Sequence, residues 1–326
     1  MEFAAYPFAT VVFPHRYPAG GFRTQRHVNQ PYTALPPGSW TVRAMPAAGR
    51  SGRRWLVGEA VDVRGIGSVV RERVEIAGVL VDRVDRAGAA EVLRRFLTDG
   101  ARHQVVTVNT DFVHLAHGDA AFRSLLNQAD LAVADGMPLV WLSRLQRAAL
   151  PGRVAGLDLV DDACRLAAEA GIGVYLLGAT PANAERASRV LVSRHPGLRI
   201  AGSFAPPFGP HTSDDEDRMV AKIRSAGRCV LFVAFGAPRQ DRFIQAHLEE
   251  LDVPIAIGVG GTFDVLAGSR RRAPAWVQDV GLEWLWRLAQ EPRRLWRRYL
   301  MRDAPLLLRL GARAMRTSLR SSAQPL

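Results

Sequence analysis

Polar residues or glycines end five apolar runs of this sequence, and these residue types suit acid–base chemistry and anion binding. Thr107 and Asn109 end the run QVVTVN, and Asp135 ends the run LAVAD. The other three runs lead into glycine-bearing stretches at residues 178–180, 235–241 and 258–264. A carboxylate such as Asp135 can take up a proton as a general base. Backbone N–H groups of glycine-rich turns that precede helices can bind phosphate groups.

The elements that carry these residues alternate between apolar strands and helical segments. We expect a hairpin at residues 73–84, strands at 104–109, 131–135, 173–179, 199–205, 229–236 and 254–260, and helices at 86–100, 110–129, 156–171, 180–197, 213–227 and 238–251. Thr110 and Thr180 have the position of helix caps. Strands that are apolar throughout indicate a parallel sheet. The fold class is therefore α/β, with a Rossmann-like parallel sheet and helices on both faces. In such sheets, ligands bind at the carboxyl ends of the strands.

The same residues also have purely structural explanations. Asp135 and Asn109 could each cap the helix that follows, and for Asp135 taken alone this interpretation is favoured. Gly258, Gly260 and Gly261 fit a tight strand-to-helix turn as well as a phosphate-binding loop. Only the gathering of all five strand ends at one edge of the sheet favours a binding site.

Metal, cofactor and nucleophile motifs are weak or missing in the sequence. His114 and His117 lie one helical turn apart beside Asp111, and a structural role is favoured over metal binding. No apolar strand ends in an Asp-x-Asp pair, so we expect no metal site. The G-x-G-G spacing at 258–261 differs from the G-x-G-x-x-G dinucleotide fingerprint, and we expect no cofactor. The arrangements typical of Ser-His-Asp and Cys-His nucleophiles are also missing.

Composition indicates a globular protein with anionic partners. The chain has 326 residues and a formal net charge of +12, and Lys222 is its single lysine. Positive charge is dense before about residue 75 and again from Arg270 to Arg320, which suggests phosphates, nucleic acid or an acidic membrane. Cys164 and Cys229 lie far apart in apolar segments, so we expect no disulfide and a cytoplasmic location. We find no signal peptide and no apolar run long enough to span a membrane.

Three regions differ in character along the chain. Residues 1–71 are rich in Pro, Gly and Arg and predict a disordered or loosely ordered leader. Residues 72–268 hold the α/β pattern. Residues 269–326 form a basic, tryptophan- and arginine-rich helical C-terminal appendage, with four of the seven tryptophans between 276 and 296. Aromatic and arginine side chains in this pattern suit an interfacial helix on an anionic membrane, although a packed helical subdomain with exposed arginines is the alternative.

Seven motifs, in this order, resemble those of a known family. They are VTVNTDFV, ADLAVADGMPLVW, RVAGLDL, VYLLGA, FVAFGAPRQD, GVGGTFDVLAG and RRAPAWVQDVGLEWLWRLAQEPRRLWRRYL, within about residues 72–305. The chain thereby resembles the bacterial N-acetylmannosaminyltransferases of glycosyltransferase family 26. That family includes enzymes of wall teichoic acid, enterobacterial common antigen and exopolysaccharide synthesis. The resemblance implies inverting transfer of a sugar from a UDP-sugar to an undecaprenyl-diphosphate-linked sugar, without a metal or a cofactor.

The resemblance also implies roles for individual residues. Asp135 matches the general base of the family, and Asn109 and Gln240 match residues implicated in catalysis. Roles in binding the substrates follow for Thr107, Arg153, Asp158, Gly178, Gly236, Gly260, Gly261 and Asp264. Arg287, Arg294 and Arg297 correspond to appendage arginines that meet the diphosphate. Three positions depart from the family pattern, because Val108 replaces a proline, Arg239 a lysine and Asp241 a glutamate. None of these departures removes a proposed catalytic group.

Elementary chemistry agrees with this function more than with two others. Inverting transfer needs one base for the acceptor hydroxyl and positive charge for the departing UDP, and arginine suits phosphate well. A nucleotide-dependent Rossmann oxidoreductase is the alternative, but the first strand–helix turn lacks the required glycines. A nucleic-acid-binding protein would leave the polar strand ends unexplained, so no nucleic acid is expected.

The expected partners follow from the resemblance and the charge distribution. They are a UDP-sugar donor, a polyprenyl-diphosphate-linked sugar acceptor and an anionic membrane surface at the inner face of the cell membrane. The donor sugar stays open between N-acetylmannosamine, N-acetylmannosaminuronate and glucose. A homo-oligomer also stays open.

Overall fold

The computed structural model describes residues 40–42, 60–62 and 71–312. The chain divides into two compact units, Met1–Glu72 and Arg73–Leu326. In the first unit, β1 (Trp40–Val42) pairs antiparallel with β2 (Ala60–Asp62). The rest of the predicted leader lies outside the described residues, apart from Arg71. The second unit contains the predicted α/β pattern.

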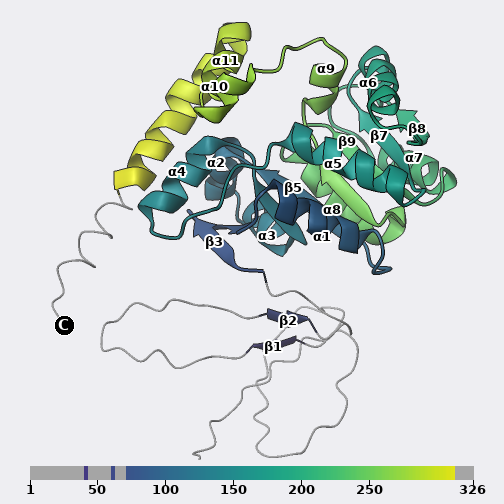
Figure 1. The fold of residues 1–326 in the computed structure, drawn as a ribbon, viewed down its shortest axis with the longest axis horizontal. Coiled ribbons are helices and arrows are strands. Elements are labelled where there is room, and N and C mark those ends of the chain that lie inside the picture. The colour runs from purple at the N-terminus through teal and green to yellow at the C-terminus, as the bar shows by residue number, and fades with distance from the viewer. Residues whose placement is uncertain (1–39, 43–59, 63–70, 313–326) are drawn as a thin grey trace, which may run out of the picture. The chain divides into compact units, whose positions relative to one another are not determined.

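A six-stranded parallel sheet forms the centre of this unit (Figure 1). Its strand order is β6-β5-β10-β9-β7-β8. The strands are β5 (His103–Val108), β6 (Leu131–Ala134), β7 (Gly173–Gly178), β8 (Ile200–Phe204), β9 (Cys229–Ala234) and β10 (Ile255–Gly258). All neighbouring strands pair in parallel. The predicted α/β class with a Rossmann-like sheet is confirmed.

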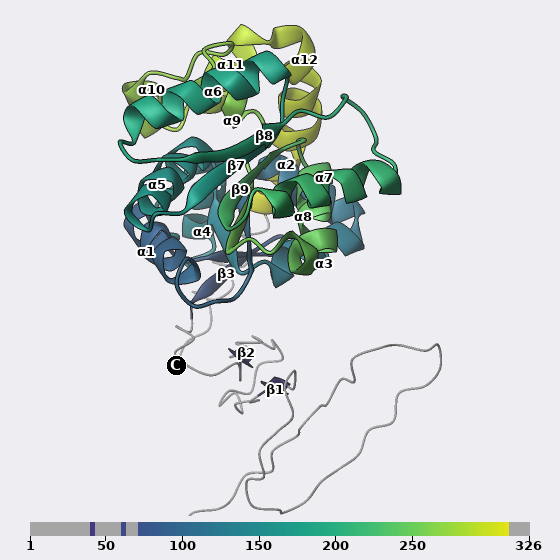
Figure 2. The ribbon, with the colours of Figure 1, turned by 90° about the vertical axis from the view of Figure 1, so that its right-hand side faces the viewer.

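Helices cover both faces of the sheet because successive strand residues point to opposite sides. One face packs against α1 (Arg86–Phe96), α5 (Gly156–Glu169) and α6 (Pro181–Arg194). The other face packs against α2 (Thr110–Gly118), α3 (Ala120–Gln128), α4 (Met137–Leu145), α7 (Ser213–Ser225) and α8 (Arg239–Leu251). Figure 2 shows α1 and α5 on one side of the strands and α3, α7 and α8 on the other. In β5, for example, Val105 belongs to the first core and Val106 to the second.

The predicted hairpin precedes the sheet and is held against its edge by a buried carboxylate. It consists of β3 (Arg73–Ile76) and β4 (Val79–Asp82), joined by Ala77 and Gly78, which both have positive φ. That geometry is the usual one for a two-residue hairpin turn. Asp82 accepts a hydrogen bond of 2.7 Å from the Ala132 amide of β6 and one of 3.1 Å from Arg73. The hairpin is therefore tied to the edge strand that carries Asp135.

The segment 110–129, predicted as one helix, forms two. Helix α2 ends at Gly118, and the Asp119 side chain accepts a hydrogen bond of 2.9 Å from the Phe122 amide to begin α3. An aspartate directly after a glycine offers a new N-cap, which favours a break over continuation. The predicted cap of the first helix was also wrong by one residue, because Asn109 caps α2 rather than Thr110. Thr180 caps α6 as predicted.

The C-terminal region is helical, as predicted for the appendage, and it packs against the α/β unit. After α9 (Thr262–Leu266) come α10 (Ala275–Asp279), α11 (Glu283–Gln290), α12 (Pro292–Trp296), a π-helical segment (Arg297–Asp303) and a helix over 304–312. Figure 1 shows α10 and α11 next to α2 and α4. Within the described residues, no helix combines the length and the apolar character that crossing a membrane requires.

Packing of the appendage onto α4 depends on Gly281. A Cβ atom at this position would lie 2.6 Å from Trp141 and 2.8 Å from Met137, both on α4. Gly281 also has a φ of +77°, a backbone conformation that residues other than glycine rarely adopt. Leu306, Leu307 and Leu310 then pack against the second core. The described part of the appendage, residues 269–312, is thus fixed over the carboxyl end of β6 rather than projecting from the domain.

Candidate active site

A pocket lies where the carboxyl ends of β5 and β6 meet the appendage. Its lining combines strand-end residues with appendage residues: Asn109, Thr110, Asp135, Gly136, Met137, Arg153, Gly281, Glu283, Trp284, Arg287 and Asp303. Four residues that the sequence predicted for the site, Asn109, Asp135, Arg153 and Arg287, therefore meet here. They come from positions up to 178 residues apart in the chain, which the parallel sheet and the docked appendage bring together.

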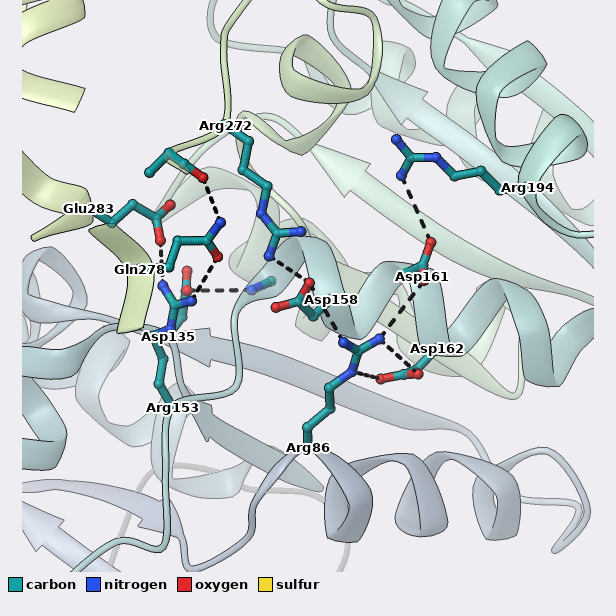
Figure 3. A network of polar contacts seen from close by, with 12 residues as sticks. Arg86, Asp135, Arg153, Asp158, Asp161, Asp162, Arg194, Arg272, Gln278 and Glu283 are labelled. Atoms are coloured by element: carbon teal, nitrogen blue, oxygen red, sulfur yellow. Dashed lines mark hydrogen bonds and ion pairs between the residues drawn. The ribbon is translucent and has the colours of Figure 1, made fainter. Parts of the chain in front are cut away.

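Asp135 is held at the end of β6 and does not cap the next helix. Its amide donates a hydrogen bond of 2.7 Å to the Val108 carbonyl of β5, which fixes the backbone. Helix α4 begins after Gly136 without any side-chain cap. The Asp135 carboxylate instead accepts a hydrogen bond of 3.4 Å from the Gly156 amide at the start of α5 (Figure 3). The capping interpretation favoured for Asp135 alone is wrong.

Burial and nearby charges act on the Asp135 carboxyl in opposite directions. Burial raises its pKa above the ordinary value, because the charged form loses water. The positive charges of Arg287 and Arg153 and the Gly156 amide lower it, while the negative charge of Glu283 raises it further. Burial is the largest of these effects, so the net result is a raised pKa. A carboxylate of this kind is a stronger base than an exposed aspartate.

Asn109 and Thr107 occupy the end of β5 in different ways. The Asn109 side-chain oxygen accepts hydrogen bonds from the amides of Asp111 and Phe112, at 3.0 and 3.3 Å, and so fixes the start of α2. Asn109 also lines the pocket. Thr107 is buried and donates a hydrogen bond of 3.3 Å to the Gly258 carbonyl. Thr107 thereby ties β5 to β10 beneath the pocket rather than lining it.

Arg153 and Arg287 are joined by one carboxylate from the appendage. Glu283 forms an ion pair with Arg153 through one carboxylate oxygen and accepts a hydrogen bond of 2.9 Å from Arg287 through the other. Arg153 also donates a hydrogen bond of 3.1 Å to Gln278, which in turn donates one of 2.6 Å to the Ala273 carbonyl. Figure 3 shows Glu283, Gln278 and Arg153 side by side next to Asp135. Two cationic groups therefore face the pocket from two different parts of the chain.

Asp158, predicted to bind substrate, forms a second ionic link between α5 and the appendage. Arg272 donates a hydrogen bond of 2.6 Å to its carboxylate, and Arg86 lies 3.9 Å from it (Figure 3). Arg86 also donates a hydrogen bond of 2.6 Å to Asp162 on the same helix. Asp158 is not among the residues that line the pocket.

Gln240 fixes two glycine-bearing loops. Its side-chain oxygen accepts hydrogen bonds from the amides of Gly236 and Gly260, at 3.1 and 2.9 Å. Gln240 is only 2% exposed and does not line the pocket. In this arrangement the two amides bind Gln240, although the sequence predicted all three residues to act on substrate. Gly178 has a φ of +103° and lies against the Ala234 backbone.

Gly261 and Asp264 lie at the turn after β10. A Cβ atom at Gly261 would lie 2.7 Å from the Arg270 guanidinium. Asp264 lies 3.4 Å from Arg270 and accepts a hydrogen bond of 2.9 Å from Asn183 on α6. Gly261 and Asp264 are not among the residues that line the pocket.

The last two predicted arginines belong to α12 and the segment after it. Arg297 is exposed, with its guanidinium 5.4 Å from the centre of the Trp296 ring. Arg297 is not among the pocket-lining residues, and the side chain of Arg294 lies outside the described part of the structure.

The sequence analysis assigned no role to two carboxylates, Glu283 in the pocket and Asp241 next to Gln240. Glu283 stands four residues before Arg287, a spacing that predicts a pair along one helix, but nothing local indicates its contact with Arg153. Asp241 is fully buried at the start of α8, and within the part of the chain that the structure describes neither of its carboxylate oxygens has a hydrogen-bond partner. Burial raises the pKa of Asp241 to about 7. Across the described ranges, no three His, Cys, Asp or Glu side chains are grouped so as to hold a metal ion.

Comparison with known proteins relates this geometry to a family. The family model described as glycosyl transferase WecG/TagA/CpsF matches residues 74–321. Two similar proteins are named N-acetylglucosaminyldiphosphoundecaprenol N-acetyl-beta-D-mannosaminyltransferase, from Staphylococcus aureus strains MW2 and NCTC 8325 / PS 47. Each is 30% identical over 246 residues, which cover 75% of this chain and 94% of the relative.

Proposed function

Because the chain belongs to the WecG/TagA/CpsF family of glycosyl transferases, we propose that it transfers a sugar from a UDP-sugar to an undecaprenyl-diphosphate-linked sugar. The coarser activity, glycosyl transfer in cell-surface polysaccharide synthesis, rests on the family and on the names of its relatives. The finer proposal rests on one observation above all. Asp135, a carboxylate with a raised pKa, lies in a pocket that also presents two arginines.

Asp135 acts as the general base in this proposal. It removes the proton from the acceptor hydroxyl as that oxygen attacks the anomeric carbon of the donor. The new bond joins the acceptor oxygen to the anomeric carbon, and the bond from that carbon to the phosphate oxygen breaks. UDP leaves with the bonding electrons from the opposite face, so the configuration inverts. Asn109 lines the same pocket from the neighbouring strand end, which supports a role in contacting these sugars.

Arg153 and Arg287 stabilise the diphosphate groups. Charge builds up on the phosphate oxygens as UDP leaves, and guanidinium groups donate paired hydrogen bonds to such oxygens. In the structure both groups are held by Glu283 at the rim of the pocket. Arginine in these positions supplies the positive charge that a metal ion provides in other sugar transferases, so the proposed reaction is metal-independent.

The appendage brings the enzyme to its lipid-linked acceptor. It exposes large apolar side chains, among them Trp276 (66% exposed), Met301 (66%) and Leu308 (74%). Exposed arginines such as Arg293 and Arg297 accompany them. Apolar and cationic side chains together bind anionic membrane surfaces. We therefore assign residues 269–326 to peripheral attachment at the inner face of the membrane and residues 72–268 to catalysis, after a leader over residues 1–71.

A donor screen tests the proposed function. Purified protein is incubated with a short-chain prenyl-diphosphate-GlcNAc acceptor and, in parallel, with UDP-N-acetylmannosamine, its uronate and UDP-glucose. The names of the relatives favour the first donor. We expect one lipid-linked disaccharide by mass spectrometry, formed in the presence of EDTA. Absence of transfer from all three donors would contradict the proposal.

A further inference from the structure

Glu283 occupies a position that no described role of the site explains. It is an acidic side chain beside the proposed base, in a pocket that has to receive two anionic substrates. Its side chain is only 20% exposed, and each of its two carboxylate oxygens binds a different arginine. Arg153 comes from the segment before α5, and Arg287 lies one turn further along α11. Glu283 is therefore the one side chain, among the contacts described above, that joins these two arginines.

The geometry limits what the two arginines can do without this carboxylate. The side chain of Arg153 is 14% exposed, and its contacts described here are with Glu283 and Gln278, both on the appendage. Without Glu283, two positive groups near the pocket would repel each other and turn toward water. With Glu283 between them, both guanidinium groups are held beside the end of β6.

The same carboxylate acts on Asp135. The charged groups that face Asp135 are Arg287 and Arg153, which favour its ionised form, and Glu283, which opposes it. Asp303 also lines the pocket, from the segment after α12. Glu283 thus offsets part of the positive charge that would otherwise weaken Asp135 as a base.

We propose that Glu283 is a positioning residue of the transfer reaction, which holds Arg153 and Arg287 for the diphosphate and keeps Asp135 basic. The proposal rests on the proposed function of the site. It also gives the appendage a role beyond covering the pocket. Glu283 reaches Arg153 because α11 is docked, and Gly281, two residues earlier, allows the close packing on α4 that docks it. Docking of the appendage and activation of the base are therefore coupled.

The test is the titration of Asp135 in the Glu283→Gln variant. Glutamine keeps the shape and one acceptor oxygen but removes the charge. The titration of Asp135 is followed by ¹³C NMR of carboxyl-labelled aspartate, and its signal is assigned with an Asp135→Asn sample. We expect the titration midpoint of Asp135 to move to lower pH. The acidic limb of the kcat/KM profile should move in the same direction, and kcat on the plateau should fall about tenfold because a weaker base accepts the proton less readily.

The matched control is Glu169→Gln. Glu169 is a glutamate on α5 that pairs with Arg94 and Arg165 at the surface. Its replacement by glutamine changes the net charge of the protein by the same amount and should leave the titration midpoint of Asp135 unchanged. Arg287→Gln is the second variant, and it should move the midpoint to higher pH. An unmoved midpoint in Glu283→Gln, with activity reduced equally at every pH, would reduce Glu283 to a structural role and overturn the proposal. If Glu283→Gln does not fold, an unmoved midpoint in Arg287→Gln overturns it. The NMR titration needs no turnover, so its result stands even if the donor screen fails.

Discussion

At the residue scale, the site depends on a competition between burial and charge at Asp135. Burial disfavours the ionised carboxylate, whereas the two arginines favour it. Burial is the larger effect, so the pKa of Asp135 is raised, and the proposed base is protonated at a higher pH than an ordinary aspartate. Activity should therefore fall as the pH decreases through that raised pKa.

Asp241 gives a prediction about stability rather than activity. Its pKa is raised to about 7 in the folded protein, so the folded state keeps a proton that the unfolded state releases above about pH 4. Stability is therefore lost as the pH rises from about 4 to about 7. We compare the free energy of unfolding of Asp241→Asn with that of the wild type at about pH 5 and at about pH 8. The difference should shift in favour of the variant by roughly 2–4 kcal/mol from the lower to the higher pH.

Urea unfolding at the two pH values measures this gain. The exposed Asp217→Asn provides the control, and its difference from the wild type should be the same at both pH values. An equal difference for Asp241→Asn at both values would show that the buried carboxyl does not carry the pH dependence.

Sequence reasoning selected some of the residues that meet in the pocket, but it missed a side chain that joins two of them. Asp135, Asn109, Arg153 and Arg287 were predicted for the site and do line one pocket. Glu283 was missed because its partner Arg153 is 130 residues away in the chain, and no local pattern reports such a contact.

Gln240 was predicted to act on substrate, but in the structure its side-chain oxygen binds two loop amides. A glutamine beside glycine-rich strand ends fits a contact with substrate as well as a support for the loops. Only its hydrogen bonds to Gly236 and Gly260 reveal that it holds the loops in this structure.

At the scale of the elements, the strands were predictable and the short helices were not. Apolar runs bounded by glycine and polar residues identify β5, β6, β7, β9 and β10 to within one or two residues. Helices α4 and α9 escaped prediction, since MPLVWLSRL is apolar without a clear period and α9 has only five residues. The break between α2 and α3 was missed because Asp119 was read as a helix residue rather than as a cap.

In the proposed function, the appendage attaches the enzyme to the membrane, and its exposed apolar side chains carry the next prediction. We expect the Trp276→Ala, Met301→Ala double variant to bind vesicles that contain phosphatidylglycerol at least about tenfold more weakly than the wild type, because both side chains lose apolar area that enters the interface. Added salt should weaken the binding of both proteins, since the arginines contribute by charge. Vesicle flotation measures the bound fraction.

Phe208→Ala is the matched control for this experiment. Phe208 is 97% exposed but lies in the loop between β8 and α7, away from the appendage in the chain. Unchanged binding by the double variant, or an equal loss in Phe208→Ala, would mean that the appendage is not the membrane-binding element.

At the scale of the whole molecule, the parallel sheet and the appendage line one pocket together. The sheet edge supplies Asp135 and Asn109, and the appendage supplies Glu283 and Arg287. The sequence predicted both halves, but it could not show that the appendage docks on α2 and α4. That arrangement depends on tight contacts such as those of Gly281 with Trp141, which no periodic pattern encodes.

The central claim is that this chain transfers a sugar with Asp135 as the base. Its most direct measurement compares the rate of sugar transfer to prenyl-diphosphate-GlcNAc by the wild type and by Asp135→Asn. The thermal unfolding and the UDP affinity of both proteins are measured as controls. The account predicts a rate at least about a hundredfold lower for the variant, with folding and UDP binding preserved. A variant that folds normally and transfers sugar at close to the wild-type rate would contradict it.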